Sequence, residues 1–344
     1  MATKIAINGF GRIGRCIVRA AVERGITDLD FVAINDLTDA KTLAHLLKYD
    51  SVHREFKGAT IGHSEKAITV GDKSIQVLAV KDPAELPWKD LGVDIVLECT
   101  GLFTDKAKAS AHLTAGAKKV LISAPAKGQD LTVVMGVNDN LYDPAKHTVI
   151  SNGSCTTNCL APIAKVMLDN FGVVRGLMTT VHSYTNDQHI LDVPHRKGDL
   201  RRARAAALSM IPSSTGAAKA LAEVIPELKG KFDGLAVRVP TPDVSLVDLT
   251  LETEKPITKA AIHEAMKKAS EGPMKAVLAY TEEELVSSDY IGNSHSSIFD
   301  ATMTSIIGDR FAKIFSWYDN EMGFSHRMVD LALLVARKGV SSQA

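Results

Sequence analysis

Cysteine is scarce in this sequence, net charge is zero, and long apolar runs are absent. The four cysteines in 344 residues, Cys16, Cys99, Cys155 and Cys159, are too few for a disulfide framework, so we expect free thiols in a reducing compartment. Forty basic residues balance forty acidic ones, which offers no general attraction for nucleic acid or a membrane. No stretch approaches the roughly 18 apolar residues of a membrane-spanning helix, and no secretory signal pattern opens the chain. These absences predict a cytoplasmic protein.

The first 150 residues alternate between short β-rich runs and segments with helical spacing of apolar residues. Strands are expected at 4–8, 30–36, 93–98 and 119–123, and helices at 12–24, 41–48 and 105–115. Strands that alternate with helices predict βαβ units and a parallel sheet covered on both faces. The length, at about 100–200 residues per domain, leaves room for a second domain.

The second half of the chain has longer β-rich runs. Strands are expected at 176–181, 234–239, 244–252 and 313–317, and helices at 259–271 and 327–337. A further helix is expected at 154–171, where Pro162 should kink or restart it. This pattern favours a mixed or antiparallel sheet.

A glycine motif follows the first expected strand. Gly9, Gly11 and Gly14 match the GxGxxG pattern, a helix follows them, and Asp36 ends the second strand. Glycines let the backbone approach a pyrophosphate at a helix N-terminus, and a carboxylate at the second strand accepts hydrogen bonds from a ribose and repels a 2′-phosphate. This context predicts an NAD site. The alternative is a plain βα turn, with Asp36 capping the next helix.

A cysteine and a histidine form a candidate nucleophile and base. Cys155, within SNGSCTTN, lies where a helix should begin, and the positive end of the helix dipole should lower the pKa of its thiol. His182 follows the strand at 176–181 and suits a general base, although an isolated histidine is more often a packing or surface residue. Cys159 is expected to be inert, and the CxxxC spacing is not that of a zinc site, so no metal is predicted.

Six segments resemble the glyceraldehyde-3-phosphate dehydrogenase family, in the family's order and along nearly the whole chain. They are INGFGRIGR at 7–15, SNGSCTTNC at 151–159, HSYTNDQ at 182–188, STGAAKA at 214–220, RVPTPDVS at 238–245 and SWYDNEMGFSHRMVD at 316–330. The resemblance implies that Cys155 is the nucleophile and His182 its base.

The resemblance also implies binding contacts. Those for inorganic phosphate are Ser154, Thr156, Thr215 and Gly216, and those for the phosphate of the substrate are Thr185 and Arg238; Arg202 is expected beside these two phosphates. Those for NAD are Arg12, Ile13, Asp36, Lys81, Ser123 and Asn320, with Tyr318 beside the nicotinamide. A homotetramer is implied as well. One departure lies in PHRKGDLRRAR at 194–204, which is about two residues longer than usual around Lys197 and Gly198.

Together these observations predict an α/β protein with a Rossmann-type NAD domain at 1–154, completed by a C-terminal helix at 320–344. An α+β catalytic domain with a mixed or antiparallel sheet is expected at 155–319. The implied activity is the NAD-dependent, phosphorylating oxidation of glyceraldehyde 3-phosphate. The alternatives are a dehydrogenase for erythrose 4-phosphate and a non-catalytic binding protein on the same scaffold.

Overall fold

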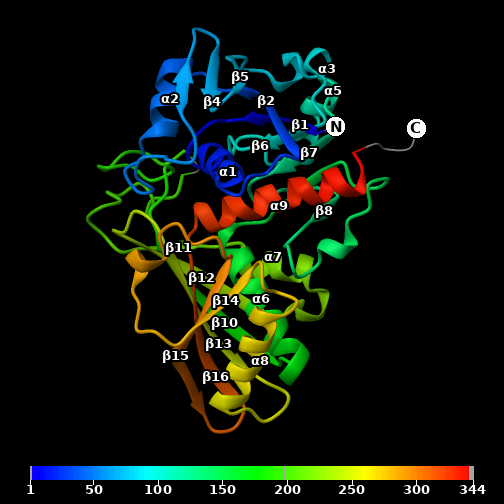
Figure 1. Cartoon of the computed structure of the whole chain (residues 1–344). Coiled ribbons are helices and arrows are strands. Elements are labelled where there is room, and N and C mark those ends of the chain that lie inside the picture. Colours follow the sequence, from blue (N-terminus) through cyan, green and yellow to red (C-terminus); the bar gives the residue numbers. More distant parts are fainter. Residues whose placement is uncertain (1, 197, 341–344) are drawn as a thin grey trace. The chain divides into compact units, whose positions relative to one another are not determined.

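A computed structural model describes residues 2–196 and 198–340 (Figure 1). The chain forms two compact units. The first comprises residues 1–154 together with residues from 325 onward, and the second comprises residues 155–324. No helix in the described ranges has the length and apolar character needed to cross a bilayer.

The first unit is built on a nine-stranded sheet in the order β3-β4-β5-β2-β1-β6-β7-β9-β8. Only β3 and β4, and β4 and β5, pair antiparallel; the other neighbours are parallel. Its strands are β1 (Thr3–Asn8), β2 (Leu29–Asn35), β3 (Ile61–His63), β4 (Ala67–Val70), β5 (Lys73–Leu78), β6 (Ile95–Glu98), β7 (Lys119–Ile122), β8 (Leu131–Thr132) and β9 (Val149–Ser151). This arrangement is the expected Rossmann-type sheet.

The strand order of the first unit reverses beside β1, because β2 lies on one side of β1 and β6 on the other. Ligands of open parallel sheets bind beyond the carboxyl ends of the strands at such a switch point. The helices of this unit are α1 (Arg12–Glu23), α2 (Ala40–Lys48), α3 (Trp88–Leu91), α4 (Lys106–Ala109), α5 (Ala111–Thr114), the 3-10 turns η1 (Pro83–Glu85) and η2 (Asp139–Leu141), and α9 (Met322–Lys338) from residue 325.

The second unit is built on a seven-stranded mixed sheet in the order β11-β12-β10-β13-β16-β15-β14. Its strands are β10 (Arg175–Ser183), β11 (Ile211–Ser214), β12 (Phe232–Val239), β13 (Ser245–Glu252), β14 (Leu278–Thr281), β15 (Ser297–Ile307) and β16 (Phe311–Tyr318). Its helices are α6 (Cys155–Phe171), α7 (Ala217–Val224), α8 (Lys259–Glu271) and the 3-10 turns η3 (Pro226–Leu228) and η4 (Ser287–Tyr290). Helices α6 and α8 pack on the sheet (Figure 1).

Among the described residues, one face of this second sheet carries exposed apolar side chains. Leu177 on β10 is 68% exposed and Ile307 on β15 is 74% exposed, whereas Met178 and Leu249, which face the opposite way, are buried. Ion pairs lie among them, from Arg175 to Glu252 and from Lys313 to Asp248.

Two of the expected elements differ in the structure. Helix α6 runs unbroken from Cys155 to Phe171, so the restart that was one of the two expectations at Pro162 was wrong. The residues around Pro162 are fully buried, and this packing offsets the roughly 3 kcal/mol that an interior proline costs a helix. The single helix expected at 105–115 is two short helices that meet at Ser110, whose hydroxyl donates to the carbonyl of Lys106. Such a side-chain bond competes with regular helical geometry.

Candidate active site

The glycine motif forms a tight turn between β1 and α1. Gly9 has φ +91°, and a Cβ there would lie 2.7 Å from the amide nitrogen of Thr100. A Cβ on Gly14 would lie 2.5 Å from the carbonyl oxygen of Gly9, so both positions need glycine for close packing. Gly11 differs, since a Cβ there would meet open space, and no side chain caps the helix that follows it. The open N-terminus of α1 therefore fits the pyrophosphate of NAD.

Asp36 belongs to this turn and does not cap the next helix. Its carboxylate accepts from the backbone N–H groups of Phe10, at 2.8 Å, and Thr38, at 3.1 Å. Asp39 is the residue that caps α2, through Thr42. The capping alternative for Asp36 is therefore wrong. Each of its oxygens accepts one backbone bond and has a second lone pair for a ribose hydroxyl.

Four further expected cofactor contacts, Arg12, Ile13, Lys81 and Ser123, lie in the same unit. Arg12, in the first turn of α1, forms an ion pair with Asp50, whose partnership the sequence did not indicate. Burial opposes ionisation of Asp50, but the bonds from Arg12 and from backbone N–H groups lower its pKa to about 2. Ile13 is half-buried on α1, Lys81 is exposed after β5, and Ser123 follows β7.

Cys155 and His182 meet in the second unit. Cys155 is the first residue of α6, His182 lies near the end of β10, and Sγ is 3.5 Å from Nε2. His182 Nδ1 is 2.6 Å from the carbonyl oxygen of Ser183, which can only accept, and 3.1 Å from the guanidinium of Arg238, which can only donate; we assign the proton to Nδ1 on the shorter contact. Nε2 consequently presents its lone pair to the thiol, as a general base requires.

Both members of this pair are electrically neutral around pH 7. Burial, with the charge of Arg238 next in size, lowers the pKa of His182 to about 3. Burial also raises the pKa of the Cys155 thiol, and Arg238 is the largest influence against that rise. The expected lowering of the Cys155 pKa was wrong for the chain without substrate, because desolvation of the sulfur outweighs the helix terminus and the nearby cation.

Arg238, Thr185 and Arg202 lie beside Cys155 and His182. Arg238, on β12, donates to Thr185 Oγ1 at 2.9 Å and to the carbonyl of Ser183 at 3.0 Å. Arg202 donates to Asp187 at 2.7 Å, and Thr185 donates to the same carboxylate. Sequence reasoning missed Asp187, although it lies within the HSYTNDQ segment. This cluster of two guanidinium groups and a hydroxyl has the chemistry of a phosphate site.

A second set of polar groups lies at helix N-termini. Thr215 Oγ1 accepts from Ala217 N–H at the start of α7, and Gly216 is exposed beside it. Ser154 immediately precedes α6, and Thr156 lies in its first turn. Oriented N–H groups and hydroxyls of this kind bind anions.

Tyr318 and Asn320 lie at and just after the end of β16. Tyr318 shares hydrogen bonds of 2.8 Å with Thr156 and Thr180, and its ring contacts His182 edge-on at 5.9 Å between centroids. Asn320 accepts from Ser245 at 2.7 Å. Both residues are buried, and Tyr318 packs directly against His182.

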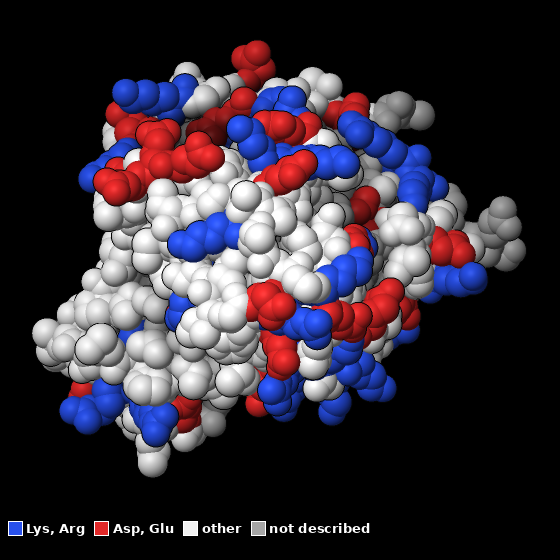
Figure 2. Space-filling model, turned by 90° about the horizontal axis from the view of Figure 1, so that it is seen from below, with Lys and Arg blue, Asp and Glu red and all other residues white. Residues whose placement is uncertain are grey.

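The segment at 194–204, which carries Arg196, Arg201, Arg202 and Arg204, has acidic partners. Arg204 pairs with Asp192 at 2.7 Å, and Asp199 accepts from the backbone N–H of Arg202. Lys197, part of the departure noted in the sequence, lies outside the described residues. Acidic and basic side chains are interspersed on the face drawn in Figure 2, which also has a broad area without charged residues.

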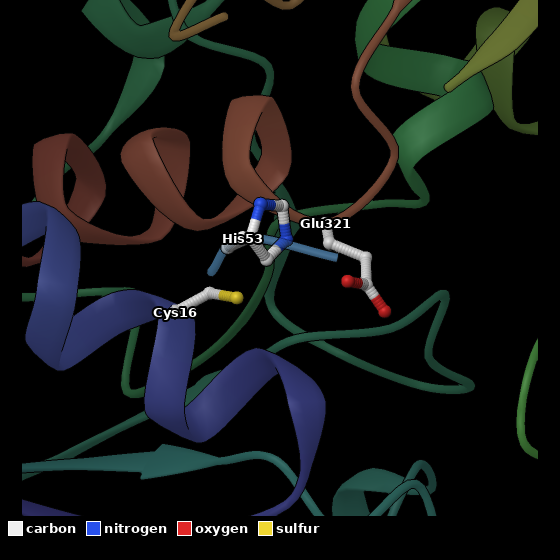
Figure 3. A group of neighbouring side chains, drawn as sticks. All are labelled: Cys16, His53 and Glu321. Carbon is white, nitrogen blue, oxygen red and sulfur yellow. The ribbon is translucent and has the colours of Figure 1, made fainter. Parts of the chain in front are cut away.

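No disulfide joins the four cysteines, all of which lie in the described ranges. Cys99 and Cys159 are held as thiols, since burial raises the pKa of each to about 12. Cys16 projects from α1 toward the ring of His53 in the same unit (Figure 3). Glu321, also labelled there, belongs to the second unit.

A Rossmann-type nucleotide unit, joined in one chain to a unit with a cysteine and a neutral histidine, defines an NAD-dependent oxidoreductase that acts on aldehydes. Comparison with known families gives two matches. The NAD binding domain of glyceraldehyde 3-phosphate dehydrogenase matches residues 3–106, and the C-terminal domain of the same enzyme matches residues 154–320. The chain belongs to the glyceraldehyde-3-phosphate dehydrogenase family.

Curated relatives cover almost all of the chain. The glyceraldehyde-3-phosphate dehydrogenase of Geobacillus stearothermophilus is 59% identical over 340 residues, which is 99% of this chain and 100% of the relative. Glyceraldehyde-3-phosphate dehydrogenase 1 of Bacillus cereus is 59% identical over 98% of this chain and 100% of its own length. The enzyme of Streptomyces coelicolor is 56% identical over 98% of this chain and 100% of its own length.

Proposed function

We propose that this chain oxidises D-glyceraldehyde 3-phosphate, with NAD and inorganic phosphate, to 1,3-bisphosphoglycerate. The observation that carries the proposal is the Cys155–His182 pair, with its 3.5 Å contact, beside the cluster of Arg238, Thr185 and Arg202. The pair performs covalent catalysis on an aldehyde, and the cluster holds the phosphate of that aldehyde.

The first step is attack by sulfur. As Cys155 Sγ bonds to the carbonyl carbon, its proton moves to His182 Nε2, and the carbonyl π electrons move to oxygen. His182 returns the proton to that oxygen, which gives a thiohemiacetal. The backbone N–H of Cys155, at the N-terminus of α6, stabilises the oxyanion while it exists. General-base transfer suits a pair that is neutral before substrate binds.

The second step is oxidation of the thiohemiacetal. NAD, when bound to the first unit, supplies the acceptor for the hydride. His182 removes the hydroxyl proton as the carbon–hydrogen bond breaks, and the carbon remains attached to Cys155 as a thioester. An oxygen of inorganic phosphate then bonds to this carbon, the carbon–sulfur bond breaks with its electrons going to sulfur, and the sulfur of Cys155 takes the proton that His182 Nε2 held. Thr215, Gly216, Ser154 and Thr156 are proposed to hold the attacking phosphate.

The remaining site assignments are proposals for the cofactor. Gly9, Gly11 and Gly14 shape the turn, Asp36 takes the adenosine ribose, and Arg12, Ile13, Lys81 and Ser123 line the first unit. Asn320 is proposed for the nicotinamide amide and Tyr318 for the ring beside it. Residues 1–154 with the C-terminal helix thus serve NAD binding, and residues 155–319 serve catalysis.

The assembly and location are proposed as a homotetramer in the cytoplasm. The face of the second sheet that carries the exposed side chains Leu177 and Ile307 supports an assembly, because large exposed apolar patches usually mark interfaces between subunits. Light scattering at micromolar concentration is expected to give the mass of four chains, and a monomer would contradict the proposal.

The test of the activity follows NADH absorbance. Glyceraldehyde 3-phosphate should give rapid NADH formation only when inorganic phosphate is present, and Cys155→Ser should abolish it. Erythrose 4-phosphate in a parallel assay serves as the competing substrate. Faster turnover of the four-carbon aldehyde, or no phosphate dependence, would refute the assignment.

A further inference from the structure

Three neighbouring strands of the first unit end in buried polar side chains. Asn8 is the last residue of β1, Asn35 the last of β2 and Glu98 the last of β6, and none is more than 6% exposed. His112, on α5, is fully buried against them. Burying a polar group in the centre of a parallel sheet costs free energy unless the group forms hydrogen bonds. The hydrogen-bond partners of these four residues therefore indicate their role.

The hydrogen bonds among these residues run in one direction only. Asn35 accepts from Val80 N–H and donates to the Val80 carbonyl, both at 2.9 Å, which fixes the orientation of its amide. Its Nδ2 therefore donates to Asn8 Oδ1 at 2.7 Å, and Asn8 Nδ2 donates to Glu98 Oε2 at 2.6 Å.

The tautomer of His112 is fixed in the same way. Trp88 Nε1 lies 3.0 Å from His112 Nδ1, and an indole nitrogen can only donate. Nδ1 is thus the acceptor, and Nε2 carries the proton that it donates to Glu98 Oε2 at 3.1 Å. The imidazole is neutral and links Trp88 to the carboxylate of Glu98.

Glu98 is the centre of this network. Its Oε2 accepts from Asn8 and His112, and its Oε1 accepts from both the N–H, at 2.8 Å, and the hydroxyl of Thr100. Four donors on two oxygens require an acceptor-only carboxylate. A buried network that is fully satisfied fixes geometry more than it adds stability.

The network supports the back of the nucleotide turn. Gly9 packs against the Cys99–Thr100 peptide so tightly that a Cβ would lie 2.7 Å from Thr100 nitrogen, and Glu98 holds this same nitrogen. Gly9 N–H also donates to the Asn35 carbonyl at 2.8 Å. A shift of the Glu98 carboxylate would therefore move the Cys99–Thr100 peptide, against which Gly9 packs.

We propose that Glu98 and His112 are positioning residues for NAD: their hydrogen-bond network aligns the ends of β1, β2 and β6, and so sets the shape of the Gly9 turn. Neither side chain contacts the cofactor in this proposal. The inference rests on NAD binding by the first unit and on no step of the proposed chemistry.

The test replaces Glu98 with glutamine, which keeps the shape but turns one acceptor into a donor. If the new amide nitrogen takes the place of Oε1, it faces the N–H of Thr100. If it takes the place of Oε2, it faces the donors of Asn8 and His112. Leaving a buried donor unsatisfied should weaken NAD binding about tenfold, measured as the calorimetric Kd without substrate. In turnover, KM for NAD should rise by a similar factor, while kcat at saturating NAD and KM for the aldehyde stay within about twofold of the wild type.

The matched control is Asp130→Asn. Asp130 is a carboxylate of the same unit that accepts from the backbone N–H groups of Thr148 and Val149, both at 2.9 Å, at the β8–β9 side of the sheet. Its replacement should reduce thermal stability and leave the Kd for NAD unchanged. If Asp130→Asn weakens NAD binding as much as Glu98→Gln does, the role of Glu98 is merely structural.

A milder variant covers the case in which Glu98→Gln does not fold. Trp88→Phe removes the donor that fixes the His112 tautomer and should weaken NAD binding in the same direction, by a smaller factor. Wild-type affinity in every folded variant overturns the inference. A wild-type chain that binds NAD yet does not oxidise glyceraldehyde 3-phosphate contradicts the proposed function instead, because the Kd is measured without the reaction.

Discussion

Replacing Arg202 should separate recognition of the substrate phosphate from the chemistry at Cys155. Two of the five N–H donors of the Arg202 guanidinium hold Ser213 and Asp187, both at 2.7 Å, so three remain for a phosphate. Its side chain is only 20% exposed, so solvent screens it little. One charge-assisted bond contributes about 1.5–3 kcal/mol, or roughly ten- to 150-fold.

Arg202→Ala should therefore lower kcat/KM for glyceraldehyde 3-phosphate at least about tenfold and leave unphosphorylated glyceraldehyde within about twofold. Both aldehydes are assayed by NADH absorbance at saturating NAD and inorganic phosphate. Arg204→Ala is the matched control, because Arg204 lies in the same loop and pairs with Asp192 at an exposed site. Its loss should change neither rate appreciably.

Arg238→Ala provides the contrast. Arg238 also donates to the Ser183 carbonyl that holds His182 Nδ1, so its removal should slow both aldehydes, the phosphorylated one more. Equal impairment of the two aldehydes by Arg202→Ala would refute the assignment of Arg202 to the substrate phosphate.

Three further results are expected. Iodoacetamide at limiting dose should label Cys155 first and remove activity in step, because His182 Nε2 lies 3.5 Å from its sulfur and can accept its proton, whereas burial raises the pKa of Cys99 and of Cys159 to about 12; faster labelling of either would show that the nucleophile is misassigned. NAD should exceed NADP at least about tenfold in specificity constant, since repulsion of a 2′-phosphate by Asp36 amounts to about 1 kcal/mol in water and ~4 at an effective dielectric near 20; Asp36→Asn should narrow that ratio, and equal use by the wild type would refute the role. The pKa of His182 falls from 6.5 to about 3 on folding, so as the pH is lowered the unfolded chain binds a proton before the folded chain does. The contribution of His182 to the free energy of unfolding is therefore fully present above pH 6.5 and declines below it. Between pH 6.5 and pH 5 the loss is about 2 kcal/mol, which His182→Asn should remove in urea unfolding; an unchanged loss would contradict the burial argument.

The fold class was predictable because its signals are local. The alternation of strands and helices, and glycines at one βα turn, indicate a parallel nucleotide sheet in any tertiary context. The unbroken course of α6 through Pro162 was not predicted, because the packing around this helix is not visible in the local sequence. The antiparallel extension at β3 and β4 was also not predicted, since no motif marks those short strands.

The pairing of Cys155 with His182 came from segments resembling a family, and the structure brings their side chains together as that resemblance implied. The direction of the Cys155 pKa shift was not predictable. A helix N-terminus is a local feature, whereas desolvation depends on residues brought in from β10 and β12. Asp187 and Asp50 were missed for the same reason, because their arginine partners are distant in sequence.

The first unit is built from two stretches of chain that are far apart in sequence, and the ribosome makes the second stretch last. This affects the order in which the two units can fold. The sheet of the first unit is encoded by residues 1–154, yet α9 arrives only with residues from 325 onward, and Asp330 of α9 pairs with Arg24 of α1. A nascent chain long enough to hold the whole nucleotide sheet still lacks the buried side chains Met328, Val329 and Leu331. All residues of the second unit leave the ribosome before α9 can complete the first unit. The nucleotide unit is therefore the last to fold fully, and its apolar surface is the one most exposed to aggregation during translation.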